Sequence, residues 1–354
     1  MTHSLRQAPS LINNNLTCSG TYLAYAQGCD VIVTNFGDNK LIACKLKNDI
    51  PGTDRQRVQP KDLATHSLLP RSLPPPVPFS DKAQVFCVKY LDFKDTSVLV
   101  VGMTDGFQVW SAEGTRMLFF HPIRPANDSD SCFVRGIDIV KGRDEFLVGD
   151  SSGAVHVFLL SSTGRGFSGK NVKSRREHEH AISDITCSAD HAVTGDDGGT
   201  LCIYSVNDDE SPGGHNLLSK THEIPTAVFP CTSLKLLGNF CVASFTSGHL
   251  RYIDLQGGCV KVEIAAHGRT ITGLSSSVLD DGTMAVASVS EDSCMSVWRV
   301  PKCLSDKAEN LYTDRVTDRQ ITGVCFVKTG HSENKIITAN FDADSMSVWD
   351  EVPY

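Results

Sequence analysis

Hydrophobic and polar positions alternate in short runs that recur along the whole chain. In each copy an apolar run is followed by a turn rich in Gly, Asp and Ser, and then by an alternating run that ends on a bulky residue. This order is typical of two antiparallel strands joined by a tight turn. The closing residues are Trp110, Phe158, Tyr204, Ile253, Trp298 and Trp349, and a weaker seventh copy lies near Val33. The pattern therefore recurs about every 48 residues, which indicates a repeat protein.

Each copy also predicts a strand on either side of this pair. An upstream strand has a V-x-x-V-x-aromatic pattern, as at Val85, Val88 and Tyr90, and a variable strand follows, as at residues 114–121 and 259–267. Units of four strands with this period are typical of the blades of a propeller. We therefore predict an all-β fold, a seven-bladed β-propeller of four-stranded antiparallel blades that occupies residues 1–354 as a single domain.

The two ends of the chain predict how the ring closes. Trp349 is followed only by Asp-Glu-Val-Pro-Tyr, so the last copy lacks its fourth strand. An unpaired sheet edge is a site for unwanted association and is usually covered. We expect part of residues 2–12 to form the missing outer strand of the last blade. Residues 48–81 contain seven prolines and lengthen one connection, so we predict an exposed proline-rich insertion between two blades.

Four residues of the sixth unit stand in a recognisable order. His267 opens the unit, Ser288 lies on the second predicted strand, Asp292 lies in the turn and Trp298 closes the third strand. This resembles the His–Ser–Asp–Trp hydrogen-bond network of WD-repeat proteins, and similar stretches extend from residue 13 to residue 300. In the fourth unit His178 takes the matching position, with Asp197 as the expected aspartate, displaced by one residue.

The resemblance implies a noncatalytic scaffold or adaptor that binds other proteins. It further implies a cytoplasmic or vesicle-associated protein in signalling or trafficking. Two alternatives remain open: a substrate receptor of a ubiquitin ligase, and a hydrolase that acts at the mouth of the propeller channel. Receptors of the first kind often carry W-D-x-R after the third strand, but this chain has Val352 where the arginine would stand. The second needs converging carboxylates or a metal cluster, which the sequence does not display.

One position of the repeat carries a cation or a titratable group in three units. The residue two before the first strand is His180, Arg269 or Arg319. In WD-repeat families this end of the strand lies on the partner-binding face around the channel. We predict that the three residues form a patch suited to an acidic peptide, since the chain as a whole is acidic. A competing interpretation pairs them with nearby acids such as Asp318.

The proline-rich insertion contains a second candidate interaction element. Arg71 precedes Leu73-Pro74-Pro75, and Pro75 with Pro78 supplies a P-x-x-P pair. This pattern resembles a ligand of proline-recognition domains of the SH3 type, although its spacing departs by one residue from the arginine-first form. A basic cluster at Arg165–Arg176 is interpreted as a solvated connection, with docking of an acidic partner as the alternative.

Charge and composition exclude several classes of function. The chain has 33 Lys and Arg against 41 Asp and Glu, a net charge of −8, which disfavours nucleic acid as a partner. No run of apolar residues reaches the length of a transmembrane helix. The 13 cysteines include no C-x-x-C pair, and several stand in apolar runs, which indicates buried thiols in a reducing compartment.

Three motifs invite catalytic, metal or cofactor chemistry. Residues 164–171, GRGFSGKN, approach a phosphate-binding loop, but Asn171 replaces the hydroxyl residue and no helical pattern follows. We interpret the stretch as a connection between blades. His178 and His180 alternate like a metal pair but lack an assignable third ligand. Asp292 beside Ser290 and Cys294 is explained as a turn acceptor. We therefore predict no enzyme activity, no metal and no cofactor.

Overall fold

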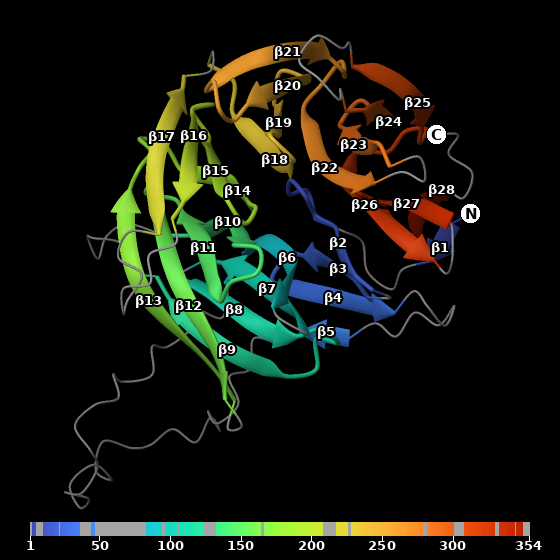
Figure 1. Ribbon diagram of the computed structural model, residues 1–354. Helices are drawn as coiled ribbons and strands as arrows, with labels where there is room; N and C mark the ends of the chain where they lie inside the picture. Colours follow the sequence, from blue (N-terminus) through green and yellow to red (C-terminus); the bar gives the residue numbers. More distant parts are fainter. Residues whose placement is uncertain are drawn as a thin grey trace, which may run out of the picture.

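Seven four-stranded antiparallel sheets surround a common axis in the computed structural model of the protein (Figure 1). The structure describes residues 2–4, 10–20, 22–35, 44–46, 83–93, 96–104, 106–123, 132–163, 166–207, 217–225, 228–278, 282–300, 308–329, 333–343 and 345–349. Within these ranges the regular elements are all β-strands. The prediction of a seven-bladed β-propeller is confirmed.

Blades 1 to 4 are formed by consecutive strands, each sheet running from the axis outwards. Blade 1 contains β2 (Thr17–Ser19), β3 (Tyr22–Gln27), β4 (Asp30–Asn35) and β5 (Cys44–Leu46). Blade 2 contains β6 (Val85–Phe93), β7 (Thr96–Met103), β8 (Gly106–Ser111) and β9 (Met117–Pro122). Blade 3 contains β10 (Val134–Ile139), β11 (Glu145–Asp150), β12 (Ala154–Thr163) and β13 (Gly166–Arg176). Blade 4 contains β14 (Ile182–Cys187), β15 (His191–Asp196), β16 (Leu201–Val206) and β17 (Leu218–Ile224).

Blades 5 and 6 repeat this order, and blade 7 departs from it. Blade 5 contains β18 (Cys231–Leu237), β19 (Phe240–Phe245), β20 (His249–Asp254) and β21 (Cys259–Ala265). Blade 6 contains β22 (Ile271–Val278), β23 (Met284–Ser290), β24 (Cys294–Arg299) and β25 (Glu309–Arg315). Blade 7 combines β26 (Ile321–Thr329), β27 (Glu333–Asn340) and β28 (Ser345–Trp349) with β1 (Thr2–Ser4).

Strand β1 closes the ring as the outer strand of blade 7. It pairs antiparallel with β28, with Thr2 opposite Ser347 and Ser4 opposite Ser345. The first and last described strands, β1 and β28, therefore lie side by side in one blade (Figure 1). The prediction that residues within 2–12 supply the missing strand is confirmed. The pairing removes the sheet edge that β28 would otherwise expose.

The hydrophobic core is divided among the interfaces between neighbouring blades. Each described apolar cluster combines strands of two adjacent blades, from blades 1 and 2 round to blades 7 and 1. The last of these joins Leu23 and Tyr25 of blade 1 to Ile337 and Val348 of blade 7. Alternation along each strand explains this arrangement, because both faces of every blade are covered and successive side chains point to opposite neighbours.

The stretch that resembles a phosphate-binding loop is not a connection between blades, as predicted, but largely the outer strand of blade 3. Lys170 lies on β13 opposite Leu159 of β12, and Asn171 lies opposite Phe158. A phosphate-binding loop requires a turn that leads directly into a helix, whose amides hold the phosphate. Here the backbone amides belong to an antiparallel ladder. The basic cluster accordingly follows the outer edge of blade 3, where Lys170, Arg175 and Arg176 are exposed.

Candidate functional site

The innermost strands of six blades begin in the same way. In each, the first residue pairs with the last residue of the second strand, and a β-bulge follows immediately. The six pairs are Val85–Met103, Val134–Asp150, Ile182–Asp196, Cys231–Phe245, Ile271–Ser290 and Ile321–Asn340. Residues two positions before these strands are therefore structurally equivalent and lie at the same end of the ring.

At this equivalent position the ring has two different halves. Blades 2 and 3 place Ala83 and Cys132 there, and both are buried. Blades 4 to 7 place exposed residues there, which we call the blade 4–7 rim: His180, Phe229, Arg269 and Arg319. The three residues predicted from the sequence are thus joined by Phe229, which belongs to the blade between His180 and Arg269. The equivalence follows from strand register, which the sequence pattern alone did not reveal for blade 5.

Phe229 is half exposed, and its neighbour Val228 is exposed to 87% of its surface. Val228 has a φ of 55°, a left-handed conformation that is strongly disfavoured for a β-branched residue. An apolar pair held out of the core by a strained backbone is typical of a contact site rather than of a packing element. The stretch Ala227-Val228-Phe229-Pro230 between two blades was the sequence signal for this feature.

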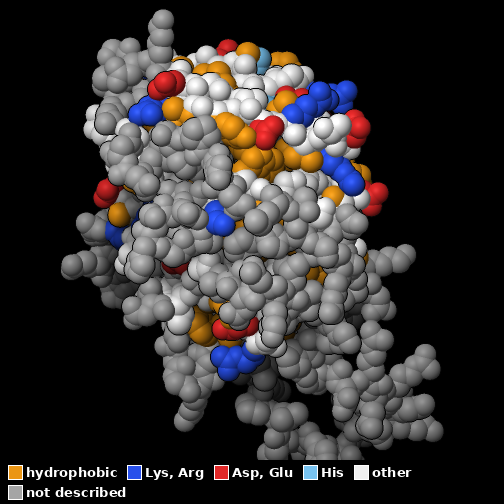
Figure 2. All heavy atoms as spheres, turned by 90° about the vertical axis from the view of Figure 1, so that its right-hand side faces the viewer, with side chains coloured by type: hydrophobic (Ala, Val, Ile, Leu, Met, Phe, Trp, Pro, Cys, Tyr) orange, Lys and Arg blue, Asp and Glu red, His pale blue; other side chains and the backbone are white. Residues whose placement is uncertain are grey.

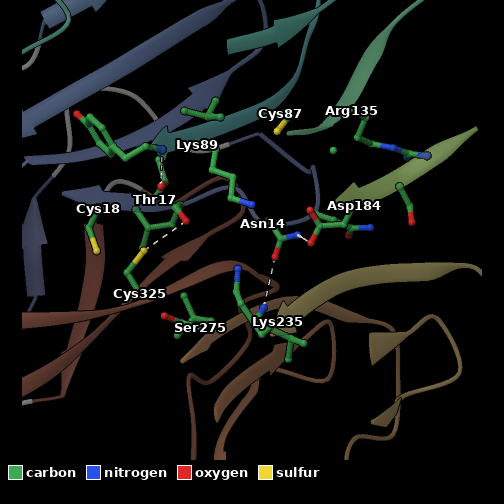
Figure 3. A pocket seen from close by; sticks show the side chains of 18 of the residues that line it. Asn14, Thr17, Cys18, Cys87, Lys89, Arg135, Asp184, Lys235, Ser275 and Cys325 are labelled. Carbon is green, nitrogen blue, oxygen red and sulfur yellow. Dashed lines mark hydrogen bonds between the residues drawn. The ribbon is translucent and has the colours of Figure 1, made fainter. Parts of the chain in front are cut away.

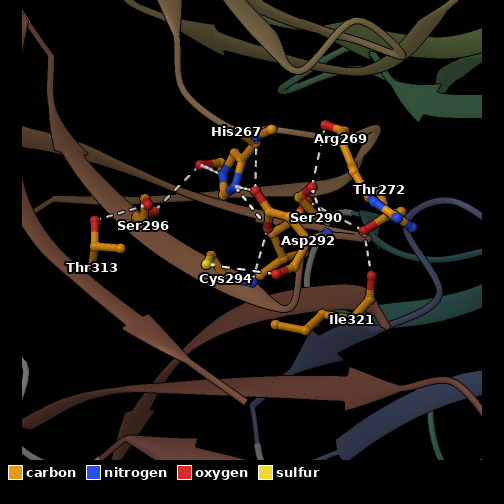
Figure 4. Close-up of polar contacts among 12 residues, drawn as sticks. His267, Arg269, Thr272, Ser290, Asp292, Cys294, Ser296, Thr313 and Ile321 are labelled. Atoms are coloured by element: carbon orange, nitrogen blue, oxygen red, sulfur yellow. Dashed lines mark hydrogen bonds and ion pairs between the residues drawn. The ribbon is translucent and has the colours of Figure 1, made fainter. Parts of the chain in front are cut away.

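The backbone around Arg269 is fixed by the turn of its own blade. Ser290 Oγ donates a hydrogen bond of 3.2 Å to the Arg269 carbonyl oxygen (Figure 4). In blade 7 the Arg319 guanidinium donates to the Asp342 carbonyl at 3.3 Å. Among the described residues, neither arginine takes part in an ion pair, Asp318 included. Both positive charges are therefore available to a carboxylate from outside.

Below the rim, the axis of the ring contains a cavity of about 220 Å³. The innermost strands of several blades line it, as Figure 3 shows, with Lys89, Asp184 and Lys235 among the charged residues. The ammonium of Lys89 is 3.4 Å from Asp138 and donates to the Ile185 carbonyl at 3.1 Å. Burial opposes the charge of Lys89, but Asp138 and Asp184 raise its pKa overall. Lys89 is therefore a structural cation that links blades 2, 3 and 4.

Lys235 differs from Lys89 because its ammonium contacts no described acceptor. Its side chain points into the same space as that of Lys89 (Figure 3). Burial and the neighbouring charge of Lys89 lower the pKa of Lys235. Asp184 and Asp138 raise this pKa, but they offset only part of the decrease. The cavity therefore carries a cation that its protein surroundings do not fully compensate.

The segment before β2 crosses this channel, which the sequence did not predict. The Asn14 and Asn15 amides donate to the Thr272 and Thr322 carbonyls of blades 6 and 7, at 2.7 and 2.9 Å. The Asn14 side chain also accepts from the Leu274 amide at 3.3 Å. Its amide group donates to Asp184 Oδ2 at 3.5 Å and to the Thr232 carbonyl at 3.3 Å. The segment that leads into blade 1 therefore contacts blades 4 to 7 across the channel.

Arg135, which belongs to blade 3 and lines the cavity, connects blade 3 to blade 4. It donates to the Ile182 carbonyl at 3.1 Å and to Asp197 Oδ2 at 2.5 Å. Its guanidinium also lies 5.6 Å from the centre of the Phe133 ring, which stacks on Phe86 at 4.5 Å. Asp197, which the sequence analysis assigned to the His178 network, thus pairs with blade 3 instead.

The network expected in blade 6 is formed, and Figure 4 shows His267 facing Asp292 within it. His267 Nε2 lies 2.8 Å from Ser288 Oγ, and His267 Nδ1 lies 3.1 Å from Asp292 Oδ2. Trp298 Nε1 donates to Ser288 Oγ at 2.9 Å. Burial alone would raise the pKa of Asp292, but hydrogen bonds from His267 and the Cys294 amide lower it. Asp292 is therefore occupied as a structural acceptor.

Blade 4 has a partial version of the network, and its aspartate is Asp196 rather than the predicted Asp197. His178 Nδ1 lies 2.9 Å from Asp196 Oδ2, and His178 Nε2 lies 2.6 Å from Thr194 Oγ1. The register of the turn explains the difference, because Asp196 ends β15 opposite Ile182 and faces His178. Burial lowers the pKa of His178, but the interactions with Asp196 and Cys202 together outweigh burial and raise this pKa to about 9.

The described residues contain no cluster of three or more His, Cys, Asp or Glu side chains arranged to hold a metal. His178 is buried against Asp196, whereas His180 is exposed. The two imidazoles are therefore in different environments.

The proline-rich insertion 48–81, with Arg71, Pro75 and Pro78, lies outside the described residues. Among the described elements there is also no helix long and apolar enough to span a bilayer.

The lateral wall beside blades 6 and 7 has no single sign of charge among its described side chains. In Figure 2 acidic and basic groups are interspersed around an apolar band. Alternating charges of this kind are typical of a solvated surface.

Comparison with known proteins places the fold and the repeat in a family. A family model described as WDR54 matches residues 76–350. WD repeat-containing protein 54 of Mus musculus is 28% identical over 244 residues, which cover 65% of this chain and 68% of that protein. WD repeat domain 54 of Rattus norvegicus is 26% identical over 250 residues, which cover 66% and 70%.

Solved structures share the propeller at much lower sequence identity. A chain in "Crystal Structure of Mitotic Checkpoint Complex" has a TM-score of 0.68 at 12% identity and covers 99% of this chain and 93% of its own length. The "Structure of U3-55K" has a TM-score of 0.67 at 13% identity and covers 100% and 98%. These two likenesses show the fold alone.

Most of the chain, including blades 2 to 6 and three of the four strands of blade 7, falls within the matched family model. WD-repeat propellers are in general noncatalytic scaffolds for protein–protein interaction. The period of the repeat, the blade 6 network and the family match all agree. This chain belongs to the WDR54 family.

Proposed function

We propose that the protein is a noncatalytic scaffold that binds an acidic peptide segment of a partner protein on the blade 4–7 rim. The observation that carries the proposal is the exposed Phe229, placed by strand register between His180 and Arg269 on consecutive blades. Aromatic residues and arginines are the side chains most often responsible for binding energy at protein interfaces. Arg269 and Arg319 supply charges that no described acid pairs.

The chemistry of the rim defines the kind of peptide that fits it. Phe229 and Val228 offer an apolar contact, while Arg269 and Arg319 offer guanidinium groups for carboxylates. A matching segment has a bulky apolar residue flanked by Asp or Glu. The charges steer the peptide to this end of the ring, and the apolar contact slows its release. Binding is accordingly expected to weaken as salt is raised.

Two further parts of this proposal rest on other grounds, the location on the family resemblance and the insertion on its proline pattern. We place the protein in the cytoplasm or on vesicles, as an adaptor in signalling or trafficking. The proline-rich insertion 48–81, with Arg71, Pro75 and Pro78, stays a second candidate for binding, in that case to a proline-recognition domain. Imaging of a fluorescent fusion in cells tests the location, and a peptide of residues 68–81 tests the insertion.

The rim is tested by charge reversal with a matched control. Arg269→Glu combined with Arg319→Glu reverses two exposed charges on the rim. Arg175→Glu combined with Arg176→Glu makes the same change on the outer strand β13 of blade 3. Affinity purification from cells, followed by quantitative mass spectrometry, is compared for the two variants and the unmodified protein. The rim variant should lose specific partners that the control retains.

A second variant separates the apolar contact from the charges. Phe229→Ala removes the exposed ring and is expected to weaken binding of a captured partner by about 30-fold, the effect of losing roughly 2 kcal/mol at an interface hot spot. Binding is measured by titration with the partner's acidic segment. If the rim variant and the Phe229→Ala variant both bind partners as the unmodified protein does, the rim is not the binding face.

A further inference from the structure

Two cysteines lie on opposite sides of the seam where the ring is not continuous in sequence. Cys18 belongs to β2 of blade 1, and Cys325 belongs to β26 of blade 7. Cys18 Sγ donates to the Phe326 carbonyl at 3.3 Å, and Cys325 Sγ donates to the Leu16 carbonyl at 3.3 Å. Each thiol therefore contacts the backbone of the strand or segment that carries the other, 307 positions away along the chain.

The Cys18 and Cys325 side chains lie next to each other, on strands of blades 1 and 7 (Figure 3). Both thiols are free in the structure. Both line the central cavity of about 220 Å³, which is large enough to admit a small oxidant. Cys325 is buried, whereas Cys18 is half buried and is the more accessible of the two. Proximity, access and placement at the seam are three independent properties of this pair.

We propose that Cys18 and Cys325 form a reversible peroxide-sensitive disulfide that fastens blade 1 to blade 7. Cys18 is the attacking residue and Cys325 is the resolving residue. The interaction with the neighbouring Cys325 thiol, aided by Lys235, lowers the pKa of Cys18 despite burial and the nearby Asp92. The same interaction, together with burial, raises the pKa of Cys325 well above its usual value. The thiolate form, which is the nucleophile, is thus favoured at Cys18.

The reaction with a peroxide proceeds in two displacements. The Cys18 thiolate attacks one oxygen of hydrogen peroxide, the O–O bond breaks, and a sulfenic acid forms at Cys18 while the released hydroxide takes up a proton to become water. Cys325 then attacks the Cys18 sulfur. The S–O bond breaks, the S–S bond forms, and a second water leaves with the Cys325 proton. The two thiols together lose two electrons, and hydrogen peroxide gains them and becomes two molecules of water. A thiol reductant restores the two thiols by thiol–disulfide exchange.

The crosslink would act at the junction of blades 1 and 7, where the two ends of the described chain meet. Blade 7 is otherwise completed by β1, which pairs over only Thr2–Ser4. A disulfide between Cys18 and Cys325 closes a loop that contains most of the chain, so it restricts the unfolded state strongly. Under oxidising conditions the ring therefore stays closed even when β1 detaches. In the reduced protein, closure of the ring depends on β1, on the segment that contains Asn14 and Asn15, and on the apolar core shared by blades 7 and 1.

Mass spectrometry of the full chain tests the pair directly. Cys29 shares the tryptic peptide 7–40 with Cys18, so the measurement is made in a Cys29→Ser background, where the crosslink to peptide 320–328 identifies the pair. Peroxide treatment, alkylation of remaining thiols and digestion without reductant should yield this crosslinked peptide, and dithiothreitol should remove it. In Cys325→Ser, a sulfenic acid at Cys18 should be trapped by dimedone. The Cys187→Ser control, a buried thiol away from the cavity, should still form the crosslink.

A stability measurement tests the role of the crosslink in closure. Peroxide should raise the Tm of the full chain by about 5 °C. It should raise the Tm of a variant lacking residues 1–9 by more, and Cys325→Ser should abolish both increases. Recovery of Cys18 and Cys325 as alkylated thiols at peroxide concentrations that oxidise other cysteines would overturn the proposal. A crosslink without any change in Tm would overturn its structural role at the seam.

Discussion

The His178–Asp196 pair makes the stability of the propeller depend on pH. Both side chains are almost completely buried, with exposures of 0% and 1%, so solvent does not screen their interaction. The pKa of His178 rises from 6.5 to about 9 because burial, which lowers it, is outweighed by interactions with Asp196 and Cys202 together. Each unit of this shift corresponds to about 1.4 kcal/mol. The surroundings of His178, with Asp196 as the main partner, therefore contribute on the order of 3 kcal/mol, a large part of the 5–15 kcal/mol typical of a whole domain.

The direction of the pH dependence follows from the direction of the shift. Because the folded pKa lies above the unfolded value, the folded state binds one more proton between about pH 6.5 and pH 9. The contribution is fully present below pH 6.5 and is lost as the pH rises through 9. The free energy of unfolding should accordingly fall by up to about 3 kcal/mol as the pH rises across this interval.

Urea unfolding at several pH values, combined with one substitution, checks this reasoning. Asp196→Asn keeps the shape of the partner but removes its charge, so the pKa of His178 should fall and the loss of stability between pH 6.5 and 9 should become clearly smaller. The difference between the two profiles isolates the pair from cysteines and other groups that titrate in the same range. An imidazole NMR titration of His178 gives the pKa directly. Parallel profiles for the two proteins, or a His178 pKa below 7, would refute the argument.

Two further predictions concern the seam and the WD network. Deletion of residues 1–9 removes the three ladder pairs of β1 with β28 and should destabilise the ring by about 3 kcal/mol, seen as a lower Tm in reducing buffer; an unchanged melting curve would contradict closure by β1. Trp298→Phe removes the hydrogen bond from Nε1 to Ser288 while keeping most of the apolar surface, and should cost about 1–2 kcal/mol. An unchanged urea midpoint for this variant would show that the bond contributes nothing.

The propeller could be predicted because its signals are local and repeated. Alternation along a strand and the chemistry of a tight turn involve residues that are close in sequence. The same is true of the blade 6 network, in which His267, Ser288 and Trp298 belong to one unit and recur at family spacing. Closure by β1 was also predictable, since a missing fourth strand at one end matches an unassigned segment at the other.

Register limited the details of the blades. The sequence analysis placed Asp197 in the His178 network, but the turn of blade 4 directs Asp196 to the histidine and Asp197 to Arg135 of blade 3. A shift of one residue reverses the direction of a side chain on a strand, so a motif displaced by one position cannot be assigned from spacing alone. The same limitation concealed Phe229, whose equivalence to Arg269 depends on the pairing of Cys231 with Phe245.

By itself, the sequence determined the number of blades, their strand order and the means by which the ring closes, because repeated short-range patterns specify each blade separately. Only the tertiary structure decided which residues meet at the axis: Asn14 against Leu274, Lys235 inside the cavity, and Cys18 beside Cys325. These contacts join segments that lie hundreds of residues apart. Closing the ring brings them together, and no local pattern of hydrophobic and polar residues records that geometry.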